Sequence, residues 1–185
     1  MAGGTGAHGG AGARAADAPL HGVLDGLGPA AREIGALHGR DARMEAFAQL
    51  WWDACSPLGT SWDGFYADVP GEPDDRRLAL AARRPKPACS PIGMHGACGQ
   101  CLRAARSLVV HDVADLGAGY VACDPRDRSE LVVPCLAADG TAWGVFDVDS
   151  HAVGAFGVPD ALACERLLVL AGLSAPHRAE PRVSR

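Results

Sequence analysis

The 185-residue sequence has few aromatic side chains, no excess of positive charge and no long apolar run. Phe, Trp and Tyr make up 5% of it, and the formal net charge is −5. An acidic chain attracts neither nucleic acid nor an anionic membrane, so neither is expected as the main partner. The absence of a long apolar run argues against a membrane-spanning helix. The N-terminus also lacks the basic-then-apolar pattern of a secretory signal, so we expect a cytoplasmic protein.

The seven cysteines are an odd number, which does not indicate a secreted disulfide framework. In a reducing compartment they are expected to be thiols, ligands or catalytic groups. Cys98 and Cys101 form a C-x-x-C pair, but a proline-rich loop precedes it where a thioredoxin-like centre has a buried strand. A zinc site could use His95, Cys98, Cys101 and either Cys123 or Cys89. Because only one such pair exists, no metal is expected.

The length suits one domain with a sizeable core. Residues 1–29 are dominated by Gly and Ala with few large apolar side chains, which predicts a flexible tail. Residues 30–176 are expected to form the domain, and residues 177–185 a loose C-terminal tail.

Hydrophobic spacing predicts a helix that begins at an N-cap, Asp41, and ends before Pro57. A last helix is expected to begin near Pro159. Strands are predicted at 62–69, 78–83, 108–111, 129–137 and 141–150, with a short helix over 96–106. The connection 112–128 is long and irregular, and such connections often carry function.

The first predicted strand carries Trp62, Gly64 and Tyr66 on one face, because strand side chains alternate. Two interpretations stay open for these aromatic side chains. They either pack in the core or form the floor of a small-ligand pocket. In the second case the missing side chain at Gly64 would let a ligand approach the backbone.

Residues 120–150 bring one thiol and three carboxylates into a single hairpin. Cys123 lies in a polar loop, Glu130 begins the following strand, and Asp147 and Asp149 share one face of the next strand. Carboxylates among apolar residues are costly to bury without a partner. From spacing alone two interpretations are equally open: an exposed sheet face or a satisfied core network on the one hand, and a functional acidic cluster on the other.

Six short segments occur in a distinctive order along the chain. They are 62–66 (WDGFY), 86–89 (KPAC), 96–99 (GACG), 121–124 (VACD), 129–134 (SELVVP) and 144–150 (GVFDVDS). Together they resemble the free methionine-R-sulfoxide reductase family, a catalytic branch of the GAF domains, over about residues 41–172. The resemblance implies an α+β fold: a single GAF-like domain with a central antiparallel sheet of about six strands and helices packed mainly on one face.

The resemblance implies an enzyme that reduces the R epimer of free methionine sulfoxide to methionine. By this likeness Cys123 is the nucleophile and becomes a sulfenic acid, Cys89 converts that acid to a disulfide, and Cys98 is an auxiliary partner. Thioredoxin then reduces the disulfide as an external reductant, with no cofactor bound. A homodimer is also implied.

The resemblance gives the remaining residues substrate-binding roles. Trp62 and Tyr66 match an aromatic pocket for the S-methyl end of the substrate, and Glu130, Asp147 and Asp149 match an acidic cluster that holds it. Crowded carboxylates raise one another's pKa, so one carboxylic acid could protonate the sulfoxide oxygen while the ionised ones bind the substrate ammonium.

A GAF module that binds a small molecule and signals without turnover is the alternative. No attached output domain is expected in this chain, and a sensor has little need for Cys89, Cys98 and Cys123 together. The chain departs from the family pattern in the approach to Cys89 and in residues 91–97. Cys101 is an additional thiol relative to that pattern.

Overall fold

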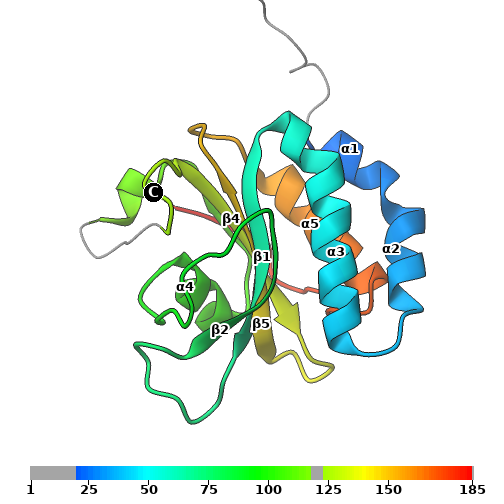
Figure 1. The fold of residues 1–185 in the computed structure, drawn as a ribbon, viewed down its shortest axis with the longest axis horizontal. Helices are drawn as coiled ribbons and strands as arrows, with labels where there is room; N and C mark the ends of the chain where they lie inside the picture. Colours follow the sequence, from blue (N-terminus) through cyan, green and yellow to red (C-terminus); the bar gives the residue numbers. More distant parts are fainter. Residues whose placement is uncertain (1–19, 118–122, 185) are drawn as a thin grey trace, which may run out of the picture.

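The computed structural model describes residues 20–117 and 123–184, and its centre is a six-stranded sheet (Figure 1). The strands are β1 Thr60–Asp68, β2 Leu78–Arg84, β3 Leu108–Val110, β4 Ser129–Leu136, β5 Ala142–Ser150 and β6 Arg182–Val183. Their order across the sheet is β2-β1-β5-β4-β3-β6. In these residues β3 and β6 pair in parallel and the other neighbours are antiparallel. The α+β prediction is confirmed, with the sheet mixed rather than wholly antiparallel.

Helices cover the two faces of the sheet unequally (Figure 1). The larger layer contains α1 Leu20–Gly26, α2 Gly28–Gly35, α3 Arg40–Cys55 and α5 Val158–Leu170. The opposite face carries α4 Ala97–Ala104 and long loops, together with the short 3₁₀ turn η2 Val113–Leu116. The prediction that helices pack mainly on one face therefore holds for the described residues.

Strand alternation divides the apolar side chains into two cores. Phe65 and Phe146 face the larger helical layer, with ring centroids 4.7 Å apart, and Phe47 of α3 meets Phe146 edge-on at 5.1 Å. Trp62 and Tyr66 belong to the second core, beneath α4. The second core is the smaller one, and it lies beside the thiols and carboxyls that are candidates for a functional site.

The segment 20–29, predicted to be part of a flexible tail, is helical, so that prediction is wrong there. Leu24 of α1 is fully buried, and Leu20 and Leu27 pack against the same core. These three leucines recur at helical spacing, so they form one apolar stripe that the surrounding Gly and Ala obscure. A Cβ added at Gly35 would lie 2.6 Å from the Leu170 carbonyl, which shows how closely α2 approaches α5. Residues 1–19 of the predicted tail lie outside the described residues.

The loose C-terminal tail is also a wrong prediction for the described residues. Arg182 donates its backbone N–H to the Ser107 carbonyl at 2.8 Å, and Ser184 donates to the Val109 carbonyl at 2.9 Å. The tail thus supplies hydrogen-bond partners to the edge of β3. Edge pairing depends on backbone groups, so side-chain composition does not reveal it.

The predicted helix boundaries need one correction. α3 begins at Arg40 after Gly39, whose φ of 85° turns the chain, and no side chain caps it. Asp41 lies instead in the first turn, where its charge complements the helix dipole. α3 ends at Cys55 and α5 begins with Pro159 in its first turn, as predicted. Within the described residues no helix is both long and apolar enough to cross a bilayer.

Asp63 is an unusual member of the helix-covered face. Its side chain is 0% exposed, and neither carboxylate oxygen has a hydrogen-bond partner among the described residues. Burial raises the pKa of Asp63 to about 8, although nearby Arg84 lowers it. The folded protein therefore holds a neutral carboxylic acid in its core near neutral pH.

This buried acid predicts a pH-dependent stability. The unfolded chain releases the Asp63 proton near about pH 4, and the folded protein releases it near pH 8. The free energy of unfolding should therefore fall as pH rises through this window. Between about pH 5 and pH 8, the free energy of unfolding should fall less in Asp63→Asn than in the wild-type protein, by on the order of a few kcal/mol. Urea denaturation at each pH would measure this difference. Exposed Asp115→Asn is the control, and parallel wild-type and Asp63→Asn curves would contradict the prediction.

The packing of α1 predicts that Leu24→Ala destabilises the protein by about 2–4 kcal/mol, because the truncation leaves a cavity in the core. Leu37→Ala removes the same atoms from a side chain that is 40% exposed, so it should change stability by less than about 0.5 kcal/mol. Thermal and urea unfolding of the full chain would measure both. Equal effects of the two variants would restore the flexible-tail interpretation.

Candidate active site

The register of three neighbouring strands assembles the acidic cluster. Asp149 of β5 pairs with Glu130 of β4 on one side and with Trp62 of β1 on the other. Asp147 lies two residues before Asp149 on the same face of β5, and it pairs with Gly64 of β1. Side chains from strands distant in sequence thus share one face, because residues two apart on a strand point the same way.

Gly64 makes room for Trp62. A Cβ at Gly64 would lie 2.4 Å from the Trp62 ring, so the ring already occupies the space above this glycine. The expectation that a ligand approaches the Gly64 backbone is therefore wrong. The Tyr66 ring lies 6.0 Å from the Trp62 ring, and the two aromatic side chains form one apolar wall.

The same two aromatic side chains hold the loop that carries Cys89, residues 85–96, called here the Cys89 loop. The indole Nε1 of Trp62 donates to the Lys86 carbonyl at 3.0 Å. The Tyr66 hydroxyl donates to the Cys89 carbonyl at 2.9 Å. Trp62 and Tyr66 therefore fix the position of a thiol as well as forming an apolar surface.

Cys123 and Cys89 are both exposed thiols at the mouth of the site. Although Cys123 is an exposed residue, partial desolvation of its thiol raises the pKa to about 12, with a further rise from hydrogen bonding to the Cys89 thiol. Next to it, Arg126 and Lys86 hold the pKa of Asp124 well below its usual range. The Lys86–Asp124 ion pair ties the Cys89 loop to the segment that bears Cys123.

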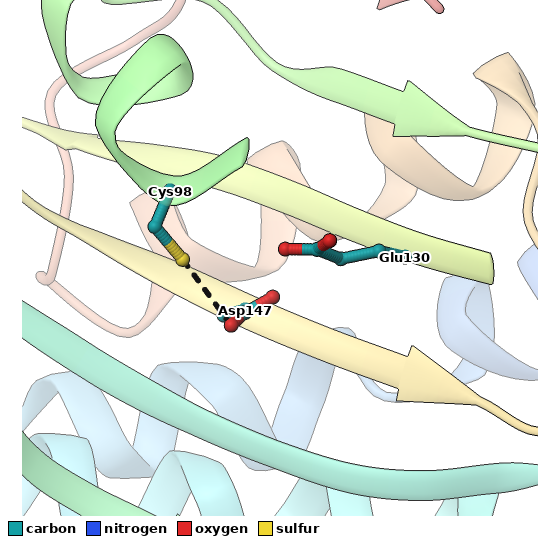
Figure 2. A group of neighbouring side chains, drawn as sticks. All are labelled: Cys98, Glu130 and Asp147. Carbon is teal, nitrogen blue, oxygen red and sulfur yellow. Dashed lines mark hydrogen bonds between the residues drawn. The ribbon is translucent and has the colours of Figure 1, made fainter. Parts of the chain in front are cut away.

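Cys98, Glu130 and Asp147 converge from α4, β4 and β5 (Figure 2). The Cys98 thiol donates to Asp147 Oδ2 at 3.2 Å, and all three side chains are buried. Burial raises the pKa of Asp147 to about 6, while hydrogen bonds with Cys98 and Glu130 oppose the rise. Burial, with the charges of Asp147 and Glu130, also raises the pKa of the Cys98 thiol well above its ordinary value.

Asp149 completes this cluster and is half-buried. Burial raises its pKa well above the ordinary value, and the neighbouring charges of Asp147 and Glu130 add to the rise. Close carboxylates resist joint ionisation, so a protonated carboxyl is more favourable in this cluster than at an isolated, exposed position. The arrangement can donate a proton from one carboxyl and offer negative charge from another.

A cavity of about 400 Å³ is lined by all the residues to which the family resemblance assigns a catalytic or substrate-binding role. These residues are Trp62, Tyr66, Cys89, Cys98, Cys123, Glu130, Asp147 and Asp149. Its wall also includes His95, which the sequence offered only as a zinc ligand, and Ser61, Lys86, Asp124 and Asp127, to which the sequence assigned no role. Lys86 and Asp124 could have been found from the sequence, because each belongs to a motif segment that also contains a predicted catalytic cysteine.

The zinc set considered from the sequence is not assembled. Cys101 is buried and directs its thiol to the Val132 carbonyl at 3.5 Å, so it contacts β4. Cys55, Cys135 and Cys164 are buried in the other core, behind the sheet. Different ligand-type atoms cluster in the described residues, at Cys98, Glu130 and Asp147 and at Asp124, Asp127 and His151.

Comparison with known proteins identifies relatives of this chain. The free methionine-R-sulfoxide reductase of Saccharomyces cerevisiae is 34% identical over 105 residues, which are 55% of this chain and 57% of that protein. The match thus spans little more than half of the yeast protein's length. Protein ZMO0507 of Zymomonas mobilis is 31% identical over 132 residues, covering 71% of this chain and 77% of that protein.

Solved structures agree with these relatives. The free methionine-R-sulfoxide reductase of Neisseria meningitidis, determined in complex with its substrate, superposes with a TM-score of 0.73 and 28% identity. That match covers 84% of this chain and 90% of the other. The GAF domain family model matches residues 42–175. The chain therefore belongs to the GAF domain family, and within it the predicted resemblance to free methionine-R-sulfoxide reductases is confirmed.

Proposed function

We propose that this protein is an L-methionine (R)-S-oxide reductase, which reduces free methionine-R-sulfoxide and is recycled by thioredoxin. The observation that carries the proposal is the single cavity in which the exposed thiols Cys89 and Cys123 meet the carboxyl cluster. Relatives at moderate identity bear the name of this reductase, which supports the same reaction class. The reaction requires no bound cofactor.

Substrate binding follows from the chemistry of the cavity wall. Trp62 and Tyr66 offer an apolar surface for the S-methyl group. Glu130 and Asp147, when ionised, bind the ammonium of a free amino acid. A sulfoxide within a peptide lacks that ammonium, so this pocket selects the free amino acid.

The first chemical step transfers the sulfoxide oxygen to Cys123. Asp149 donates a proton to the sulfoxide oxygen, because burial and the charges of Asp147 and Glu130 raise its pKa and so favour the protonated carboxyl. The sulfur of Cys123 attacks the sulfoxide sulfur, and the net step gives methionine and a Cys123 sulfenic acid. Methionine gains the two electrons that the thiol loses. Because its pKa is raised, the Cys123 thiol keeps its proton until the attack, when that proton passes to the Asp149 carboxylate and restores the acid.

The second step restores the thiol. Cys89 attacks the Cys123 sulfenic acid, water leaves, and a Cys89–Cys123 disulfide forms. The dithiol of thioredoxin then reduces this disulfide and becomes oxidised, and Cys98 serves as an auxiliary partner in the exchange. The ion pair between Lys86 and Asp124 supports this step, since it keeps the two thiol-bearing segments together.

The reaction bears on where the protein acts, and the resemblance bears on its assembly. Recycling by thioredoxin requires a reducing compartment, so we propose that the protein acts in the cytoplasm. We also retain the homodimer implied by the resemblance, which sedimentation of the reduced protein would test.

The proposed substrate predicts a narrow specificity. With thioredoxin, thioredoxin reductase and NADPH, the full chain should oxidise NADPH with the free R epimer of methionine sulfoxide. It should not do so with the S epimer or with N-acetylmethionine sulfoxide, which lacks the ammonium. If folded, reduced protein turned over none of the three, the ligand-sensing alternative would replace the reductase.

The proposed roles of Cys123 and Cys89 predict that their serine variants lose activity in different ways. Cys123→Ser should abolish methionine formation, because the oxygen acceptor is gone. Cys89→Ser should release about one methionine per enzyme and then stall at the sulfenic acid, detected by dimedone labelling and mass spectrometry. Cys164→Ala, behind the sheet, is the matched control and should retain activity. Sustained turnover by Cys123→Ser would contradict the assignment of the nucleophile.

A further inference from the structure

The cluster of Cys98, Glu130 and Asp147 has the features of a cation site (Figure 2). One donor atom from each side chain lies within 4.8 Å of the other two. The side chains are only 4%, 4% and 7% exposed, and they come from three different elements of the fold. Side chains fixed on a helix and two strands are better positioned than loop side chains to hold a ligand.

We propose that Cys98, Glu130 and Asp147 bind a thiophilic divalent cation, Zn²⁺ being the representative ion, and that this ion excludes the substrate from the cavity. The cation is a reversible inhibitor, distinct from any resident cofactor. The site itself does not depend on the proposed reaction, and only the inhibition rests on it.

The distances between ligand atoms fit this ion. Ligand atoms around a tetrahedral zinc lie roughly 3.5 Å from one another, given bonds of about 2.0–2.3 Å. Cys98 Sγ and Asp147 Oδ2 are already 3.2 Å apart. A small rotation of the Glu130 side chain would bring its carboxylate to the same ion, and water or His95, which also lines the cavity, could complete the coordination.

The charges around the cluster favour a cation as well. Asp147 Oδ1 is buried without a hydrogen-bond partner among the described residues, although its side chain is only 7% exposed. Lys86, a cation in the cavity wall, is paired with Asp124. A buried carboxylate with an unused oxygen is costly, and a bound cation would remove that cost.

The donor set selects the kind of cation. A thiolate with two carboxylates suits Zn²⁺ and related ions, whereas Mg²⁺ and Ca²⁺ prefer oxygen ligands alone. Binding displaces the proton of the Cys98 thiol and any proton held by the carboxyls. The ion also occupies Glu130 and Asp147, which are the groups proposed to hold the substrate ammonium, so metal and substrate compete.

Cobalt titration of the reduced full chain tests the site without turnover. Co²⁺ bound to a thiolate gives a charge-transfer absorption, which Zn²⁺ should then abolish by displacement. We expect one equivalent of Co²⁺ to bind with this band and free methionine to weaken the binding. The absence of a thiolate band in folded, reduced protein would overturn the proposal.

Matched variants locate the metal. The double variant Cys89→Ser, Cys123→Ser and the single variant Cys101→Ser should keep the band, whereas Cys98→Ser should lose it. Glu130→Gln should weaken binding at least about tenfold. A band that survives Cys98→Ser but disappears in the double variant would assign the metal to the exposed thiols and refute the proposal. Thermal unfolding of each variant confirms that it is folded.

Inhibition is measured on methionine formed in a single turnover without thioredoxin, because the thioredoxin dithiol binds zinc itself. Zn²⁺ at one equivalent should suppress this methionine at least about tenfold, and a chelator should restore it. Unchanged methionine formation with zinc bound would overturn the competition. Absence of methionine formation without zinc would instead refute the proposed function and leave the cobalt result valid.

Discussion

The antiparallel pairing of β5 with both β1 and β4 is the constraint on which the site depends. This register places Trp62, Asp149 and Glu130 in one row and Gly64 and Asp147 in the next. A slip of one residue would turn the carboxylates toward the helical core and the phenylalanines toward the cavity. The packing of the rings of Phe65 and Phe146 therefore helps to stabilise the register that aligns the acids on the opposite face.

The burial of acidic groups follows from the same sheet. Asp147 faces the cavity and Asp63 faces the helices, so two carboxyls with raised pKa values lie on opposite faces of adjacent strands. In the proposed function the buried carboxyls of the cavity have separate roles: Asp149 donates a proton, and ionised Asp147 and Glu130 attract a cation. The proposed substrate ammonium and the proposed divalent metal would both neutralise the negative charge of these two carboxylates.

Much of the fold was predictable because it rests on local patterns. Runs of strand-forming residues between turns located β1, β4 and β5, and the spacing of Met44, Phe47 and Trp51 located α3. The errors arose where local composition misleads. The leucine stripe of α1 is diluted by Gly and Ala, and β6 forms through backbone hydrogen bonds that no side-chain pattern records. Gly64 was linked to a ligand, although the Trp62 ring fills the space above it.

The sequence by itself determined which reactive side chains are present and which strand faces they occupy, since residue type and alternation are local properties. It also carried the resemblance that the family match confirmed. Only the tertiary structure decided which groups meet. It brought Cys98 from α4 to Asp147, turned Cys101 toward β4, and joined Lys86 to Asp124 across the two thiol-bearing segments. Such contacts depend on how elements distant in the chain pack against each other, and spacing along the sequence contains no record of that packing.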